Sequence, residues 1–190
     1  SEEDVIHEGY TVEEILDMFY DKEQVTLTED GAVKALDPEL HEDTLASSAI
    51  IDPEREKPIV RPNKKITPAK LKRIAKAGIE EIRITDSELY SKFAARDIYD
   101  EETGEIYVEC NEQLNEDNVE QLRKAGITEI PVLFIDGIKV GSYLRDTLAV
   151  DKVNSPEDAR MEIYQRLRPG DPPTQETADH LFENRFYKSE

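Results

Sequence analysis

Two stretches of this 190-residue chain repeat one another forty-eight positions apart, and no other feature restricts its possible folds as strongly. The stretch KKITPAKLKRIAKAGIEEI ends at Ile82, and the stretch EQLNEDNVEQLRKAGITEI ends at Ile130. The four residues Lys-Ala-Gly-Ile occur at the same place in both. Internal repetition of so small a unit is typical of a scaffold that packs against itself. Nothing in the repeated unit resembles a reaction centre.

The chain is strongly acidic, with 44 Asp and Glu residues against 24 Lys and Arg residues and a formal net charge of -20. A solvated acidic surface repels phosphate, which argues against nucleic-acid binding by the chain alone. The single cysteine, Cys110, excludes an internal disulfide. No apolar run approaches the ~20 residues of a membrane span, and the acidic start is unlike a signal peptide. We therefore expect a cytoplasmic protein with no membrane contact.

Each copy of the repeat predicts a β-hairpin, then a helix, then a strand. Thr67 and Asn115 are suited to cap the two helices, because their side-chain oxygens can accept a backbone N–H of the first turn. Gly78 and Gly126 are suited to end them, because glycine adopts the positive φ of a helix C-terminus at little cost. A further hairpin is expected around Glu29-Asp30-Gly31, where an alternating pattern turns.

Helical patterns lie outside the repeat as well. They cover residues 11–20, which open with the capping-box pair Thr11 and Glu14, a short segment from Pro38 to about Ala46, and two segments that begin at Ser155 and Thr174. The pattern predicts an α+β fold in which a helical and β host domain is interrupted by an insertion. The host comprises residues 1–36 and 141–190, and the insertion comprises residues 37–140, with copy one at about 45–84 and copy two at about 93–135.

No catalytic or metal-binding constellation is found. The glycines form no phosphate-binding loop, and the three histidines lack metal-ligand spacing. His41, in the sequence ELHED, is expected on an acidic surface loop. A hydrolase that uses surface carboxylates would need two buried acids, and the sequence offers no candidate pair. We expect no catalytic residue, no metal site and no cofactor in this chain.

Two groups of basic residues stand out against the acidic background. Lys72, Arg73 and Lys76 concentrate on the first repeat helix, where they form either a solvated face or a docking site for an acidic partner. Arg166 and Arg168 cluster at a rigid Pro-Gly turn. Arginine at a fixed turn suits phosphate contact, because its planar guanidinium donates several hydrogen bonds. The alternative for these arginines is ordinary charge complementarity at a helix C-terminus.

The last fifty residues carry a specific resemblance. The elements GSY (141–143), EIY (162–164), RPGDPPT (168–174) and LFENRF (181–186) resemble a segment of the bacterial DNA-dependent RNA polymerase beta-subunit family. The run GYTVEEILDMFYD (9–21) resembles the helix that lies upstream in that family. Ser142 stands where the family usually has proline, and Arg185 where leucine is common.

The resemblance implies the lobe (beta2) domain of that subunit with a lineage-specific insertion. It implies a non-catalytic part of a nucleotidyltransferase, because the catalytic aspartates and their magnesium belong to another subunit. The lobe would help to form the downstream DNA channel, with Arg168 and the neighbouring Arg166 facing DNA. Expected partners are the beta', alpha and sigma subunits, DNA in the assembled enzyme, and transcription regulators on the outward insertion. The alternative is a free-standing acidic adaptor module that binds basic proteins.

Overall fold

The structure, a computed structural model, describes residues 9–137 and 140–149. The chain divides into two compact units. One contains residues 21–140, and the other contains the segments that end at Tyr20 and begin at Gly141. The helices predicted from Ser155 and Thr174 lie outside the described residues. None of the described helices has the length and apolar character that a membrane span requires.

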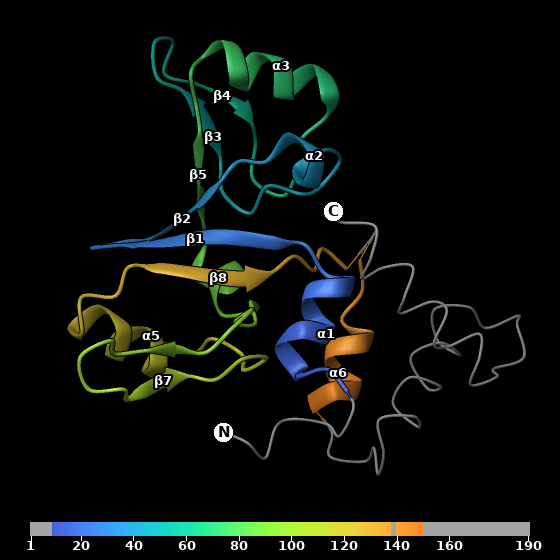
Figure 1. Cartoon of the computed structure of the whole chain (residues 1–190). Helices are drawn as coiled ribbons and strands as arrows, with labels where there is room; N and C mark the ends of the chain where they lie inside the picture. Colours follow the sequence, from blue (N-terminus) through green and yellow to red (C-terminus); the bar gives the residue numbers. More distant parts are fainter. Residues whose placement is uncertain (1–8, 138–139, 150–190) are drawn as a thin grey trace, which may run out of the picture. The chain divides into compact units, whose positions relative to one another are not determined.

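The unit of residues 21–140 contains both copies of the repeat (Figure 1). Its elements are, in chain order, β1 (Lys22–Thr28), β2 (Gly31–Ala35), α2 (Pro38–His41), β3 (Ile50–Asp52), β4 (Lys57–Val60), α3 (Pro68–Lys76), β5 (Glu81–Ile84), α4 (Asp86–Leu89), β6 (Ile98–Tyr99), β7 (Ile106–Val108), α5 (Glu116–Lys124) and β8 (Glu129–Leu133). The predicted α+β class is confirmed, because short helices accompany three small antiparallel sheets in the described residues.

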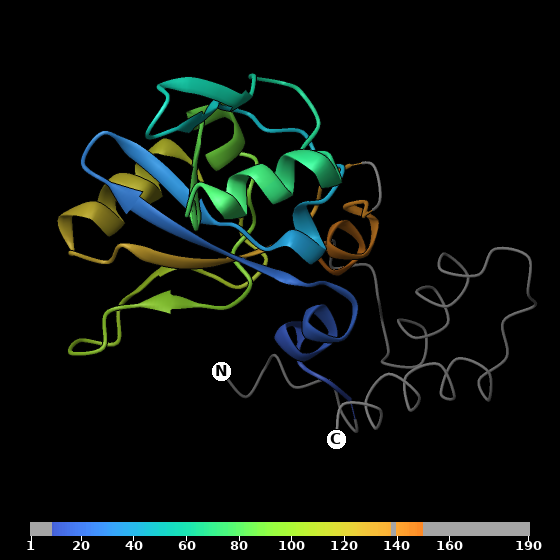
Figure 2. The same ribbon diagram turned by 90° about the horizontal axis from the view of Figure 1, so that it is seen from above.

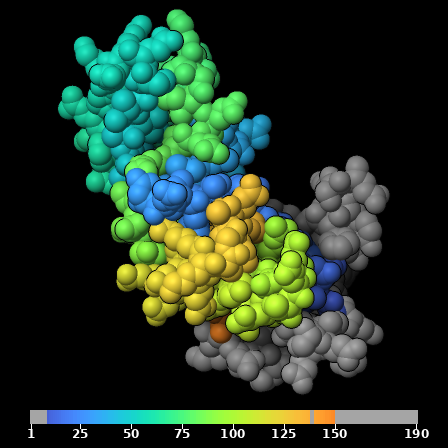
Figure 3. Space-filling model, turned by 90° about the vertical axis from the view of Figure 1, so that its left-hand side faces the viewer, coloured from blue at the N-terminus to red at the C-terminus, as the bar shows by residue number. Residues whose placement is uncertain are grey.

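A four-stranded antiparallel sheet in the order β5-β2-β1-β8 joins the two copies. The β1–β2 hairpin lies in its centre and turns at Glu29-Asp30-Gly31, as predicted. Strand β5, at the end of copy one, pairs with β2, and strand β8, at the end of copy two, pairs with β1. Figures 1 and 3 show the two copies on opposite sides of this hairpin.

This sheet changes the predicted division of the chain. The sequence assigned residues 1–36 to the host domain, whereas β1 and β2 pair along their length with strands of residues 21–140. The division by packing therefore falls after Tyr20 and not near residue 36. The hairpin pattern alone reveals no partner, because strand pairing depends on residues distant in sequence.

The two copies have buried residues at corresponding positions. One core includes Ala46, Ile50, Val60, Ile66, Ile74 and Ile82, and the other includes Ala94, Ile98, Val108, Leu114, Leu122 and Ile130. Each residue of the second set lies forty-eight positions after its counterpart. The backbone follows the same correspondence: Ala46 N–H donates to Lys64 O at 3.0 Å, and Ala94 N–H donates to Glu112 O at 2.9 Å.

The helix ends follow the predicted local chemistry. Thr11 and Glu14 form the expected capping box on α1 (Val12–Phe19), and Thr67 and Asn115 cap α3 and α5. Gly78 and Gly126 both have a φ of +74°. This is the left-handed backbone conformation that commonly ends an α-helix. Gly104, in the turn between β6 and β7, has a φ of +75°. The predictions for the three caps and for Gly78 and Gly126 are confirmed.

One predicted helix is shorter in the structure, and one observed helix was not predicted. The helix from Pro38 ends at His41 rather than near Ala46, because residues 44–46 form backbone hydrogen bonds with residues 64–66. Helix α4 was not predicted, although Thr85 followed by Glu88 is a capping signal that could have revealed it. Near the end of the larger unit, Gly137 N–H donates to Val140 O at 3.0 Å.

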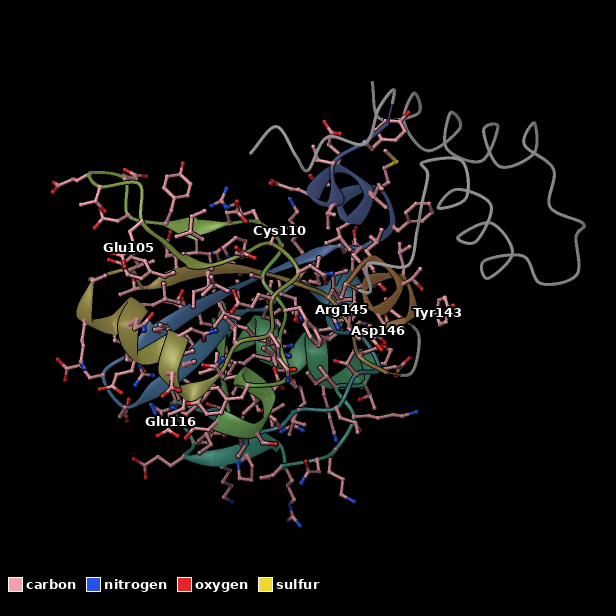
Figure 4. The ribbon with its side chains drawn as sticks, turned by 90° about the horizontal axis from the view of Figure 1, so that it is seen from below. Glu105, Cys110, Glu116, Tyr143, Arg145 and Asp146 are labelled. Carbon is pink, nitrogen blue, oxygen red and sulfur yellow. The ribbon has the colours of Figure 1, made fainter. Side chains whose placement is uncertain are left out.

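The second unit brings together residues 121 positions apart in the chain. Helix α1 (Val12–Phe19) packs against α6 (Tyr143–Ala149). The Tyr20 hydroxyl donates to Gly141 O at 2.9 Å and accepts from Arg145 N–H at 3.4 Å. Burial raises the pKa of the Tyr20 phenol, so it remains a donor at neutral pH. On α6, Arg145 Nη1 lies 2.7 Å from Asp146 Oδ1 (Figure 4).

We expect Tyr20→Phe to destabilise the contact between α1 and α6 by about 1 to 2 kcal/mol, because it leaves two backbone groups without their partner. Urea unfolding of the 190-residue chain, together with hydrogen exchange over residues 141–149, measures the loss. Tyr99→Phe is the matched control, because the Tyr99 side chain is 52% exposed in the other unit. Equal effects of the two substitutions would show that the Tyr20 hydroxyl bonds are not needed.

Candidate functional site

The two arginines predicted to face DNA, Arg166 and Arg168, lie outside the described residues. Their role therefore stays a prediction. The three residues predicted to dock a partner, Lys72, Arg73 and Lys76, are described and all lie on α3.

Helix α3 presents these three side chains to solvent. Lys72, Arg73 and Lys76 are exposed, whereas Ile74, between them, is fully buried. Positions 72, 73 and 76 lie on one side of a helix with 3.6 residues per turn, so their charges form one patch. Within the part of the chain that the structure describes, no ion pair involves any of the three. We call these residues the α3 basic face.

The corresponding surface of copy two has a different charge. Helix α5 begins with Glu116 and Asp117, and its Lys124 Nζ lies 3.0 Å from Glu120 Oε1. The N-caps and the glycine ends of the two helices match, so the charge difference does not follow from the shared fold. Of these two helices, only α3 suits an acidic partner.

A second cluster of charged residues is buried beneath the central sheet. Glu23 of β1 has a fully buried side chain and contacts three partners. His41 Nε2 lies 2.5 Å from Glu23 Oε1, Lys92 Nζ lies 2.7 Å from Oε2, and Lys34 Nζ lies 3.7 Å from Oε1. Glu88 Oε2 lies 3.1 Å from Lys34 Nζ and 3.4 Å from Lys92 Nζ. We call these five residues the Glu23 cluster.

The charges of the Glu23 cluster balance each other. Burial alone would raise the pKa of Glu23, but the hydrogen bond from His41 and the charges of Lys92 and Lys34 outweigh it and lower the pKa to about 2. Burial likewise opposes ionisation of Glu88, yet the same two lysines lower its pKa. The two carboxylates thus remain ionised at neutral pH, which suits a structural ion pair and does not suit a general acid.

His41 corrects one of our expectations. Its side chain is 1% exposed and not on an acidic surface loop. His41 Nδ1 accepts the N–H of Asp37 at 3.0 Å, so the proton is on Nε2, which donates to Glu23. The acidic residues next to His41 in the sequence suggested a surface position. Its burial is explained by its hydrogen bond to Glu23, which lies eighteen positions earlier in the chain.

The sequence could have revealed one member of this cluster. Glu23 is in alternation with Val25 and Leu27, which both point into the core, and strand geometry places all three on one face. Lys92 gives no comparable signal, because it lies between elements. Within residues 9–137 and 140–149, no three His, Cys, Asp or Glu side chains lie where they could hold a metal ion.

Comparison with known proteins identifies relatives that are similar along nearly the whole chain. No family model matches the chain. It is 44% identical over 182 residues to the DNA-directed RNA polymerase subunit beta of Syntrophotalea carbinolica, 45% over 181 residues to that of Anaeromyxobacter sp., and 45% over 184 residues to that of Sorangium cellulosum. These matches cover 96%, 95% and 96% of this chain but only 13% of each relative. The chain thus matches a segment of the relatives, and the match extends across both of its units.

We expect Glu23→Gln to lower the free energy of unfolding at pH 7 by about 3 kcal/mol, because it leaves buried lysine charges without their counter-ion. The folded-state pKa of Glu23, about 2, lies below its ordinary value of 4.5. Ionised Glu23 therefore contributes stability above pH 4.5, and this contribution is lost as the pH falls toward 2. Urea unfolding of wild type and variant at several pH values from 7 down to 2 measures both effects.

Glu88→Gln is the matched control, because Glu88 is more exposed than Glu23 and we expect a smaller loss. The double substitution Glu23→Leu with Lys92→Met should be less destabilising than Glu23→Gln, since it removes a charge of each sign. A Glu23→Gln variant with wild-type stability and wild-type acid dependence would refute the structural role of the cluster.

Proposed function

We propose, from the premise that this chain belongs to the family of bacterial DNA-directed RNA polymerase beta subunits, that it is a non-catalytic lobe segment of such a subunit. The identity of 44% to 45% along nearly the whole chain carries this proposal. In the assembled enzyme, ribonucleotides would be joined on a DNA template at an active site whose magnesium another subunit would hold. This chain helps to form the downstream DNA channel. Its partners are the beta', alpha and sigma subunits and DNA, and its compartment is the cytoplasm.

Residues 21–140 form an insertion with an internal duplication in this proposal. The hydrogen bond between Tyr20 and Gly141 supports it, because the chain leaves the host and returns to it at neighbouring points. The corresponding core residues forty-eight positions apart support the duplication. The insertion points outward from the enzyme, where regulatory proteins can reach it. The free-standing adaptor has no support from the relatives named above, which are polymerase beta subunits.

The excess of acidic residues is consistent with this role. A channel wall needs a few basic side chains that face DNA, and an outward surface needs none. Arg166 and Arg168 belong to the host segment, and contacts there would be directed at phosphate and independent of base sequence. The α3 basic face belongs to the insertion, so its partner would be an acidic protein surface.

We expect Arg168→Ala in the full-length subunit of the assembled polymerase to shorten the open-complex lifetime about five-fold at moderate salt and to reduce its salt slope by about 1, as loss of one phosphate contact would. Arg166→Ala should act in the same direction. Filter binding after a heparin challenge, over a series of KCl concentrations, measures both. Arg55→Ala is the control, because Arg55 is exposed in the turn between β3 and β4 of the insertion. An unchanged lifetime for Arg168→Ala at every salt concentration would contradict the channel role.

We expect Lys72→Glu with Arg73→Glu to abolish capture of acidic regulatory proteins by the α3 basic face, because reversal of both charges repels them. The polymerase with wild-type or variant subunit is used to capture proteins from cell extract, and mass spectrometry compares the two sets. Gln121→Glu with Lys124→Glu makes a similar charge change on α5 and should have no effect. Identical sets of captured proteins for wild type and variant would leave α3 as a solvated face.

A further inference from the structure

An open hollow of about 610 Å³ lies in copy two, between the β6–β7 hairpin and the outer edge of β8. Figures 1 and 2 show the hairpin beside β8. One wall runs from Arg96 through β6 to Glu102, and the other is formed by the end of α5 and by Glu129 and Pro131. All of these residues belong to the unit of residues 21–140, so the hollow is a feature of that unit alone.

The Glu129 end of strand β8 presents an open edge to this hollow. Its inner side pairs with β1, and Leu27 N–H donates to Thr128 O and Phe134 N–H to Asp21 O. The antiparallel pattern alternates, so the backbone groups of Glu129, Pro131 and Leu133 point to the outer side.

The outer ladder is short. Leu133 N–H donates to Phe93 O, and Ala95 N–H donates to Pro131 O, both at 2.9 Å. No described segment continues this ladder to Glu129, because the chain diverges toward β6 after Ala95. The N–H and C=O of Glu129 therefore face the hollow. Pro131 agrees with an edge position, since its missing N–H is on the outer side.

Apolar surface lies beside this edge. Ile127 and Pro131 form part of the wall. On the hairpin, Tyr99 pairs with Ile106, and these side chains are 52% and 50% exposed. Two large apolar side chains on one strand pair are a surface that a partner can cover.

The charge of the hollow indicates that its partner is basic. Its lining contains five carboxylate side chains, Asp97, Asp100, Glu101, Glu102 and Glu129, against one guanidinium, that of Arg96. Glu105, which directly precedes β7, is a further exposed carboxylate of this hairpin (Figure 4). A second copy of this chain, with its net charge of -20, would be repelled.

We propose that this hollow binds an extended segment of a partner protein in which lysine or arginine alternates with apolar residues, and that the segment adds a strand to the outer edge of β8. Backbone hydrogen bonds to Glu129 hold the strand, its basic side chains meet the carboxylates, and its apolar side chains cover Tyr99 and Ile127. The inference deepens the proposed role of the insertion as a contact surface for regulatory proteins and rests on it. The competing explanation is that acidic side chains merely protect an open edge from aggregation.

The probe is a labelled peptide of about seven residues, Lys-Val-Lys-Val-Lys-Val-Lys, which has the length of an ordinary strand. Fluorescence anisotropy measures its binding to the 190-residue chain. We expect saturable binding that weakens at least about ten-fold between about 50 mM and about 500 mM KCl, because the attraction is screened. The same peptide with alternate backbone nitrogens methylated should bind at least about ten-fold more weakly, since it cannot complete a strand ladder.

Two substitutions of Glu129 distinguish the contribution of its side-chain charge to peptide binding from that of its backbone N–H. Glu129→Gln keeps the outward N–H, and we expect it to weaken binding about two- to three-fold. Glu129→Pro also removes the N–H, and we expect a loss of at least about ten-fold. Glu81→Pro is the matched control, because Glu81 is the counterpart of Glu129 on β5 and does not line the hollow. Circular dichroism melting verifies that each variant is folded.

Equal binding of the methylated and unmethylated peptides, or of wild type and Glu129→Pro, would overturn strand addition. Absence of saturable binding would overturn the whole inference in favour of edge protection. A polyglutamate peptide that binds as well as the lysine peptide would overturn the charge argument. Neither the peptide nor the 190-residue chain requires an assembled polymerase. Failure here therefore leaves the lobe assignment intact, and failure of the Arg168 experiment leaves this result intact.

Discussion

Pairing of the β1–β2 hairpin on both of its sides is the constraint on which the larger unit depends. A two-stranded hairpin alone is marginal in water. Here β5 and β8 extend it to four strands, and each brings the core of one copy with it. Beneath this sheet, the Glu23 cluster links β1, β2, α2 and the segment between the copies through one buried carboxylate. A buried carboxylate tolerates little displacement of its cations, so the cluster specifies how these segments meet.

The two copies use one scaffold to present different surfaces. Their caps, glycine ends and core positions correspond, and these are the features that a small β-hairpin and helix unit needs in order to fold. The exposed positions do not correspond in charge. Copy one carries the α3 basic face, whereas copy two carries the acidic hollow beside β8. A duplicated unit can diverge in this way because solvent-facing charge contributes little to stability.

The sequence predicted what depends on residues close to one another in the chain. Thr11, Thr67 and Asn115 were identified as caps because a side chain three residues from its N–H partner is a local arrangement. The predicted boundary near residue 36 was displaced because the alternating pattern of β1 reveals a strand but not its partners. The burial of His41 was missed for a similar reason, since Glu23 lies on another element. The open edge at Glu129 depends on where residues 93–95 leave the sheet, and no residue pattern encodes that divergence.

The bond between Tyr20 and Gly141 has a consequence for how such a chain can gain or lose its middle portion. The Tyr20 hydroxyl reaches Gly141 O at 2.9 Å, so the two ends of residues 21–140 lie within about one side-chain length of each other, a gap that a short loop or a large folded body can span. The entropy of closing a loop grows only slowly with its length, and a body whose ends meet imposes no gap to bridge. The flanking helices therefore define a fixed insertion point. The segment inserted between Tyr20 and Gly141 is free to vary in size and in charge.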